Sequence, residues 1–336
     1  MFFHPAILAL LLASLLSALV LSALLPTAVS TWRHWDVASA SERQLALERR
    51  GVLFATLMRG VAVLQALALL LAVFNADAMA VMFVGAMCAV GTLSFNEWGF
   101  PMLGTMVASF FASLVWLALD ALDQSRRDLP LVPIKQAGVF VLLPLAAAVF
   151  WLQWNYFGGL RADVITSCCG SLFSEGAPSD GTGSRLATLS PQVSMAIYFG
   201  ALLLAAACAL WQWRRPAGWG AFAVAASGIA GWVAGVAGVI AVISLYVYED
   251  PLHHCPFCLL KADYGYLGYL VYVPLFVATG AALSSAALQA CVYKPGLEPA
   301  ARAASARWAG AAALGYVIAA LAGAALVLSS PLQLIE

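Results

Sequence analysis

Charge is scarce in this sequence. Only 10% of its 336 residues are charged, whereas a soluble domain carries about 25%. The 16 basic and 16 acidic side chains cancel to a net charge of zero. The chain has no basic domain and no nucleic-acid-binding motif, which argues against nucleic acid as a partner. No polar stretch indicates an added soluble domain, and no internal repeat is visible.

Long hydrophobic runs take the place of charge. Hydrophobic residues make up 63% of the chain, in runs of the roughly 20 residues that a helix needs to cross a bilayer with its backbone polar groups satisfied. The sequence therefore predicts an all-α integral membrane protein whose surroundings are a lipid bilayer. The first run has no basic segment before it and exceeds the length of a signal peptide, so we expect it to stay as an anchor. The eight expected spans are 6–28, 53–74, 101–121, 136–157, 193–213, 219–247, 264–290 and 308–330.

Two further segments bear on the topology. The apolar stretch 77–95 is short, and we expect a re-entrant segment or a ninth span there. If it does not span, most Lys and Arg residues fall on one side, which the positive-inside rule favours. In either case the connections 158–192 and 248–262 share the exoplasmic side. Segment 29–50, which contains tryptophans, is expected to be an interfacial helix.

The expected organisation has three parts. Residues 1–130 form an N-terminal membrane region, 131–292 a four-helix bundle with the exoplasmic loop 158–192, and 293–336 a C-terminal span. Paired cysteines in the exoplasmic connections indicate an oxidising compartment. The sequence therefore predicts the inner membrane of a bacterium, with the cysteine pairs on the periplasmic face.

The cysteines in those connections carry the most specific signal. One pair is Cys255 and Cys258, in the motif His253-His254-Cys255-Pro256-Phe257-Cys258 just before the span 264–290. At the start of a helix this spacing places both sulfurs on one face, and the helix dipole favours the reactive thiolate. The motif therefore predicts a redox dithiol, with His254 handling protons; a structural disulfide is the alternative. Haem attachment needs a histidine directly after the second cysteine, and Leu259 is there instead.

The other pair is vicinal. Cys168 and Cys169 can bridge each other only through a strained ring. Exchange with Cys255 or Cys258, or binding of a soft metal, is the more natural use of two adjacent thiols. Structural bridges to the second pair are the alternative. The three single cysteines, Cys88, Cys208 and Cys291, lie in or beside apolar runs and are interpreted as small core residues.

A family resemblance rests on this layout. The order of span 136–157, cysteine loop, two spans and Cys-Pro-Phe-Cys before 264–290 resembles the four-helix core of vitamin K epoxide reductase homologues, which are functionally similar to DsbB. The resemblance covers about 135–290. It implies that Cys168 and Cys169 act as a loop shuttle and that Cys255 and Cys258 face a quinone. The adjacency of the loop cysteines departs from the family, and the first spans have no counterpart in it.

These observations leave three hypotheses. The first is a membrane thiol–disulfide oxidoreductase that exchanges electrons between exoplasmic thiols, such as those of a thioredoxin-like protein, and a membrane quinone walled by Phe257 and Tyr264. The second is a protein that binds or transports a soft metal such as copper, zinc or mercury. Its candidate ligands are Cys168, Cys169, His253, His254, Cys255 and Cys258. The third is an assembly subunit of a membrane complex with structural disulfides.

A few charges fall near or inside the spans. Arg59 lies inside one, where it snorkels to the membrane surface, pairs with an acid, or binds an anionic lipid or substrate. Asp120 and Asp123 end another span close to Arg126 and Arg127, which indicates an interfacial charge cluster.

Overall fold

The computed structural model describes residues 4–36, 41–83, 86, 88–126, 129–161 and 190–334. These residues form helices and turns and contain no strand. Most of the connection 158–192 is not among them, so Cys168 and Cys169 lie outside the described residues and their predicted roles stay predictions.

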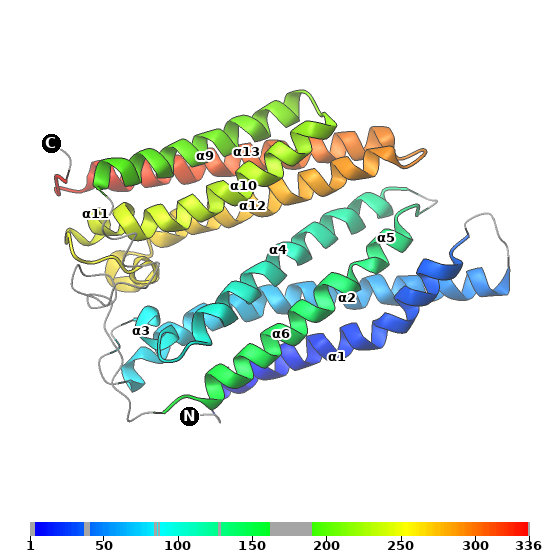
Figure 1. The fold of residues 1–336 in the computed structure, drawn as a ribbon, viewed down its shortest axis with the longest axis horizontal. Coiled ribbons are helices and arrows are strands. Elements are labelled where there is room, and N and C mark those ends of the chain that lie inside the picture. The colour runs from blue at the N-terminus through cyan, green and yellow to red at the C-terminus, as the bar shows by residue number, and fades with distance from the viewer. Residues whose placement is uncertain are drawn as a thin grey trace. The chain divides into compact units, whose positions relative to one another are not determined.

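Eight helical segments in the described residues are long and apolar enough to cross a membrane, as predicted, and indicate an integral membrane protein. Their helices run side by side over much of their length within each part of the chain (Figure 1). They are α1 (Pro5–His34), α2 (Glu42–Ala78), α4 (Gly99–Gln124), α5 with α6 (Val132–Ala137, Val139–Gly158), α9 (Pro191–Arg214), α10 with α11 (Gly218–Gly238, Ser244–Tyr248), α12 (Gly268–Ala290) and α13 (Glu298–Ser329).

Two segments differ from, or refine, the expectation. Segment 29–50 is not a separate interfacial helix, because its described residues are the end of α1 and the beginning of α2, which extend beyond the apolar runs. The stretch 77–95 holds the end of α2, the 3-10 turn Ala80–Met82 and the short helix α3 (Ala89–Leu93). No helix among its described residues is long enough to cross a bilayer, so a re-entrant path there remains a prediction.

The helices pack into two compact units. Unit 1 comprises residues 1–75, 95–161 and 291–301, and unit 2 comprises 76–94, 162–290 and 302–336. This division differs from the one expected at 130 and 292. Helix α6 lies along α1 and α4 in unit 1, and α13 belongs to unit 2 from Arg302 onward. Side-chain complementarity between distant helices decides such a grouping, and the order of spans does not reveal it.

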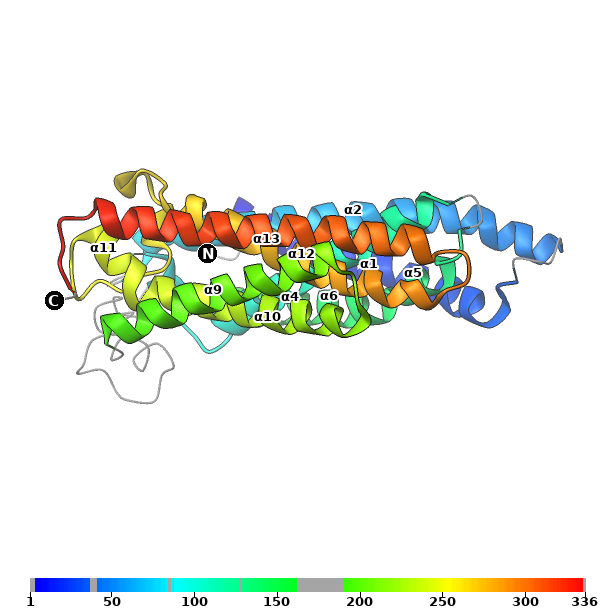
Figure 2. The same cartoon turned by 90° about the horizontal axis from the view of Figure 1, so that it is seen from above.

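Unit 2 is packed through small residues. Helix α10 lies against α9 and α12 (Figure 2). A Cβ atom added to Gly238 would lie 2.5 Å from Tyr198 Cδ2, and one added to Gly235 would lie 2.8 Å from Leu275 Cδ2. Because lipid gives helices no hydrophobic reason to associate, such close approach of backbones supplies the van der Waals contact that holds membrane helices together.

Unit 1 contains a cluster of four charges, of which three are buried and the fourth, Arg59, is partly exposed. Asp120 accepts hydrogen bonds from Arg59 Nε at 2.7 Å and from Lys135 Nζ at 2.9 Å. Lys135 Nζ also lies 2.7 Å from Asp123 Oδ2. Arg59 therefore pairs with an acid, which is one of the alternatives given above. Asp120 and Asp123 thus pair with cations on α2 and α5, and the four charges cancel. Arg127, which was expected near these acids, lies outside the described residues.

Candidate functional site: a buried cluster of three cysteines

Three cysteine sulfurs meet in unit 2. Cys88 directly precedes α3, Cys255 lies in the connection after α11, and Cys258 begins the 3-10 turn Cys258–Leu260. Their Sγ atoms all lie within 4.8 Å of one another, and Cys88 Sγ is 3.2 Å from Cys255 Sγ. All three side chains are buried. Two segments far apart in the sequence thus build one sulfur cluster.

The loop that carries two of these cysteines is held from both ends. The Tyr248 hydroxyl, at the end of α11, donates a hydrogen bond to the Cys255 carbonyl oxygen at 2.5 Å. The Tyr272 hydroxyl, in the first turns of α12, donates to the Pro256 carbonyl oxygen at 2.8 Å. Pro256 has no backbone N–H and a fixed φ, which stiffens the turn between the two thiols. These contacts fix the Cys-Pro-Phe-Cys backbone against the helix ends.

The two histidines of the motif have different surroundings. The buried His254 ring places Nδ1 2.9 Å from the Ile240 carbonyl oxygen, within the π-helical turn Val239–Ile243. A carbonyl only accepts, so Nδ1 carries the proton. Burial lowers the pKa of His254, which favours the neutral ring at neutral pH. Nε2 of that neutral ring can accept a proton, and this is compatible with the predicted proton-handling role.

His253 belongs to an aromatic group at the same place. Its ring centroid lies 4.0 Å from that of Tyr248 and 6.5 Å from that of Tyr264. Phe257, Tyr248 and Tyr264 also pack against the cysteine cluster. The two residues predicted to wall a quinone, Phe257 and Tyr264, therefore both border the sulfurs.

The Cys258 thiol is held in its protonated form. Hydrogen bonding with Cys255 and Cys88, together with burial, raises the pKa of Cys258 far above its ordinary value. The prediction that a helix N-terminus favours the thiolate is wrong, because α12 begins only at Gly268 and Cys258 starts a three-residue 3-10 turn. A dipole of useful size needs several aligned turns.

A cation lies beside the cluster. Lys261 Nζ forms an ion pair with Asp77 Oδ1 at 3.2 Å. Burial opposes the charged form of Lys261, but the bond to Asp77 and the nearby Cys258 and Cys88 raise its pKa. Both side chains are partly exposed. The ammonium is thus available to stabilise a thiolate that forms in the cluster.

The structure extends one expectation about the cysteines and corrects another. Cys88 is a buried core residue, as interpreted, and it is also the third member of the sulfur cluster. The only signal for this in the sequence is its place in an apolar stretch too short to span. In addition, Cys255 and Cys258 form no disulfide, and neither do the other cysteines in the described part of the chain, Cys88, Cys208 and Cys291. Cys208 packs against the core of unit 2, and Cys291 is buried in unit 1.

Comparison of the chain with models of protein families, with curated proteins and with solved structures gives no match. The resemblance to vitamin K epoxide reductase homologues therefore stays a hypothesis. The sulfur cluster and its surroundings are the basis on which a function can be argued.

Proposed function

We propose that the protein is a membrane thiol–disulfide oxidoreductase in which Cys88, Cys255 and Cys258 are the reactive thiols. The observation that carries the proposal is the convergence of three buried sulfurs from two separate segments. Cys88 and Cys255 need to approach by only about 1 Å to reach the length of a disulfide, roughly 2.05 Å, from their separation of 3.2 Å. A third thiol next to such a pair can resolve a mixed disulfide.

The electron balance requires an oxidant that takes two electrons. When Cys88 and Cys255 form a disulfide, their two thiols release two electrons and two protons, and a quinone that takes up both becomes a quinol. In the other half-reaction a substrate dithiol reduces the disulfide and becomes a disulfide itself. The predicted route for these electrons begins at Cys168 or Cys169 on the exoplasmic side, and the reverse direction uses the same steps.

The surroundings of the cluster suit this chemistry. Phe257 and Tyr264 offer a flat apolar surface to a quinone ring, and both pack against the sulfurs. The neutral His254 ring can receive a proton as a thiol is oxidised, and Lys261 stabilises a transient thiolate by its charge. A buried, protonated dithiol also resists nonspecific oxidation, because the thiolate is the reactive form.

Differential alkylation of the native membranes tests the proposal. Membranes are oxidised with a short-chain ubiquinone analogue or reduced with dithiothreitol, the remaining thiols are blocked, and peptides are identified by mass spectrometry. We expect a disulfide-linked peptide pair joining Cys88 to Cys255 or Cys258 after oxidation only, and its loss in Cys88→Ser. The matched control Cys208→Ser, a thiol on α9, keeps it. Three thiols that stay reduced with the quinone analogue would overturn the proposal.

One observation also favours the soft-metal alternative. Three thiolates within 4.8 Å of one another match the spacing of roughly 3.8 Å expected between sulfurs that share an ion with metal–sulfur bonds of about 2.3 Å. Such a set selects Cu(I) or Zn(II). The ligands then differ from the predicted set, since Cys88 replaces the two histidines. Competition with a Cu(I) chelator discriminates: a metal site binds one ion tightly when reduced and fails in Cys88→Ser.

The third hypothesis, an assembly subunit with structural disulfides, has no support from Cys255 and Cys258, because these cysteines form no disulfide in the structure.

A further inference from the structure

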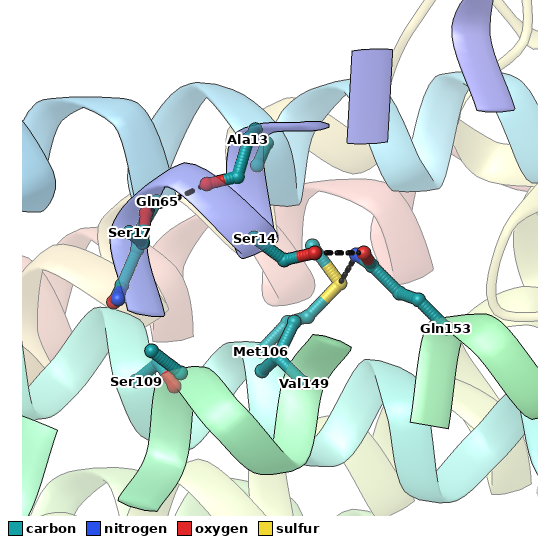
Figure 3. A pocket seen from close by; sticks show the side chains of 10 residues that line it. Ala13, Ser14, Ser17, Gln65, Met106, Ser109, Val149 and Gln153 are labelled. Atoms are coloured by element: carbon teal, nitrogen blue, oxygen red, sulfur yellow. Dashed lines mark hydrogen bonds between the residues drawn. The ribbon is translucent and has the colours of Figure 1, made fainter. Parts of the chain in front are cut away.

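Unit 1 contains a small, partly open cavity among α1, α2, α4 and α6, and polar side chains stand among the apolar ones that line it. Figure 3 shows its lining. The cavity has a volume of about 20 Å³ and is lined by Ala13, Ser14, Ser17, Gln65, Ala68, Met106, Ser109, Ala146, Val149 and Gln153. Hydroxyl and amide groups are costly inside a membrane bundle unless they find hydrogen-bond partners. Five such residues around one cavity therefore call for a physical reason.

Some of these groups satisfy one another. Ser14 Oγ donates to Gln153 Oε1 at 2.7 Å, which joins α1 to α6. Gln153 Nε2 points to the Met106 thioether at 3.7 Å, as the dashed line in Figure 3 marks. A thioether sulfur is a weak acceptor, and Gln153 is fully buried. The two amide protons of Gln153 thus have a poor acceptor in Met106.

The buried hydroxyl of Ser109 is the observation that indicates a ligand in this cavity. Its side chain is 1% exposed, and its hydroxyl forms no hydrogen bond with any other described residue. Other hydroxyls on these helices bond back to their own helix, as Ser17 does to the Ala13 carbonyl at 2.8 Å and Thr105 to the Pro101 carbonyl at 2.8 Å. A buried hydroxyl without a partner costs about 1–3 kcal/mol. A partner inside the cavity removes that cost.

We propose that this cavity is a binding site for one water molecule, held by the Ser109 hydroxyl and the amide of Gln153. A cavity must offer roughly 10–15 Å³ to hold one water and two to four polar partners to keep it. The volume of about 20 Å³ excludes organic ligands, and the lining has no charged side chain to attract an ion. The water bridges α4 and α6. Its oxygen accepts a hydrogen bond from the Gln153 amide and is a stronger acceptor than the Met106 thioether.

Radiolytic labelling tests this site, because hydroxyl radicals form from a bound water where it lies and oxidise a neighbouring thioether. Met106 lines the cavity and is 4% exposed. Met58 and Met102 belong to the same unit, do not line the cavity and are equally buried, at 1% and 2%. We expect Met106 in the purified full-length protein to be oxidised at least tenfold faster than either control on microsecond X-ray exposure.

Two variants separate bound water from general access. Ser109→Ala removes the hydroxyl with the least change in volume, and Ser109→Val fills the cavity. Both are expected to slow Met106 oxidation to the rate of Met58 and Met102, which stay unchanged. Oxidation of Met106 at the control rate in the unchanged protein would overturn the proposal. So would a fast rate that persists in Ser109→Ala.

Discussion

The two units differ in the polar side chains that they bury and in how their helices pack. Every fully buried charged side chain among the described residues lies in unit 1, namely Asp120, Asp123 and Lys135. Among its described residues unit 2 instead buries no Asp, Glu, Lys or Arg side chain. It relies on close backbone contact at glycines and brings three thiols together. Unit 1 thus depends on electrostatic compensation, whereas unit 2 depends on shape. The difference predicts which kind of substitution each unit tolerates.

The largest effect is expected from Lys135→Met in unit 1. The substitution leaves Asp123 buried with no cation and Asp120 with Arg59 alone. Removing one partner of a buried ion pair costs about 3–5 kcal/mol. Reversible unfolding in mixed micelles measures the loss. Lys294→Met is the control, because this lysine is exposed and forms no ion pair with another described residue. Substitutions at the surface change the free energy of unfolding by no more than about 0.5 kcal/mol. Equal stabilities for the two variants would contradict the dependence of unit 1 on its charges.

The next effect belongs to unit 2. Gly238→Ala forces a methyl group against Tyr198, and overpacking of this kind costs about 1–3 kcal/mol. Gly200→Ala, on α9, is the matched control, since nothing lies within 4 Å of its added Cβ atom. The same unfolding measurement is expected to show a loss for Gly238→Ala and none for Gly200→Ala. Similar stabilities in the two variants would show that α10 does not depend on close backbone approach.

The sequence predicts the helices far better than their partners. Eight apolar runs are visible because the bilayer imposes a length that hydropathy detects locally. The pairing of Arg59 with Asp120 and the approach of Cys88 to Cys255 are contacts between distant segments. No local sequence pattern predicts these contacts, because any acid or thiol at the right depth in the membrane could be the partner. The motif Cys255–Cys258 identified the region of the site, but not its third sulfur.

The direction of the pKa shift at Cys258 also differs from the sequence-based prediction, for a physical reason. A cysteine near the beginning of an apolar run looks like a helix N-terminal cysteine with a depressed pKa. The chain instead turns for ten residues before α12 begins at Gly268. The positive φ angles of Gly265 and Tyr266, +59° and +58°, make this turn. Hydrogen bonding with Cys255 and Cys88, together with burial, then sets the pKa of the Cys258 thiol in place of the helix dipole, and the shift in pKa has the opposite sign.

The raised pKa of Cys258 predicts how its alkylation depends on pH. Because the pKa of Cys258 is raised above its ordinary value of 9.0, its thiolate fraction keeps growing through pH 9 in the folded protein. Alkylation by N-ethylmaleimide is expected to rise about tenfold per pH unit from pH 7 to beyond pH 9. The same cysteine in protein unfolded by SDS is expected to level off near pH 9. Mass spectrometry of the Cys258 peptide follows both, and a plateau below pH 9 in the folded protein would contradict the raised pKa.

The smallest effect concerns the ion pair of Lys261 and Asp77 beside the sulfur cluster. The pair of Lys261 and Asp77 is partly exposed, so its loss costs at most about 1 kcal/mol of stability. Its removal has a clearer effect on the thiols. Asp77→Asn leaves the Lys261 charge to the cluster and lowers the pKa of Cys258, whereas Lys261→Met removes the charge and raises it further. We expect N-ethylmaleimide at pH 8 to label Cys258 several-fold faster in the first variant and several-fold slower in the second. If both variants shift the rate in the same direction, the pair acts through the shape of the loop. Opposite shifts would show that unit 2, which buries no Asp, Glu, Lys or Arg side chain among its described residues, uses the Lys261 ammonium to tune the pKa of Cys258.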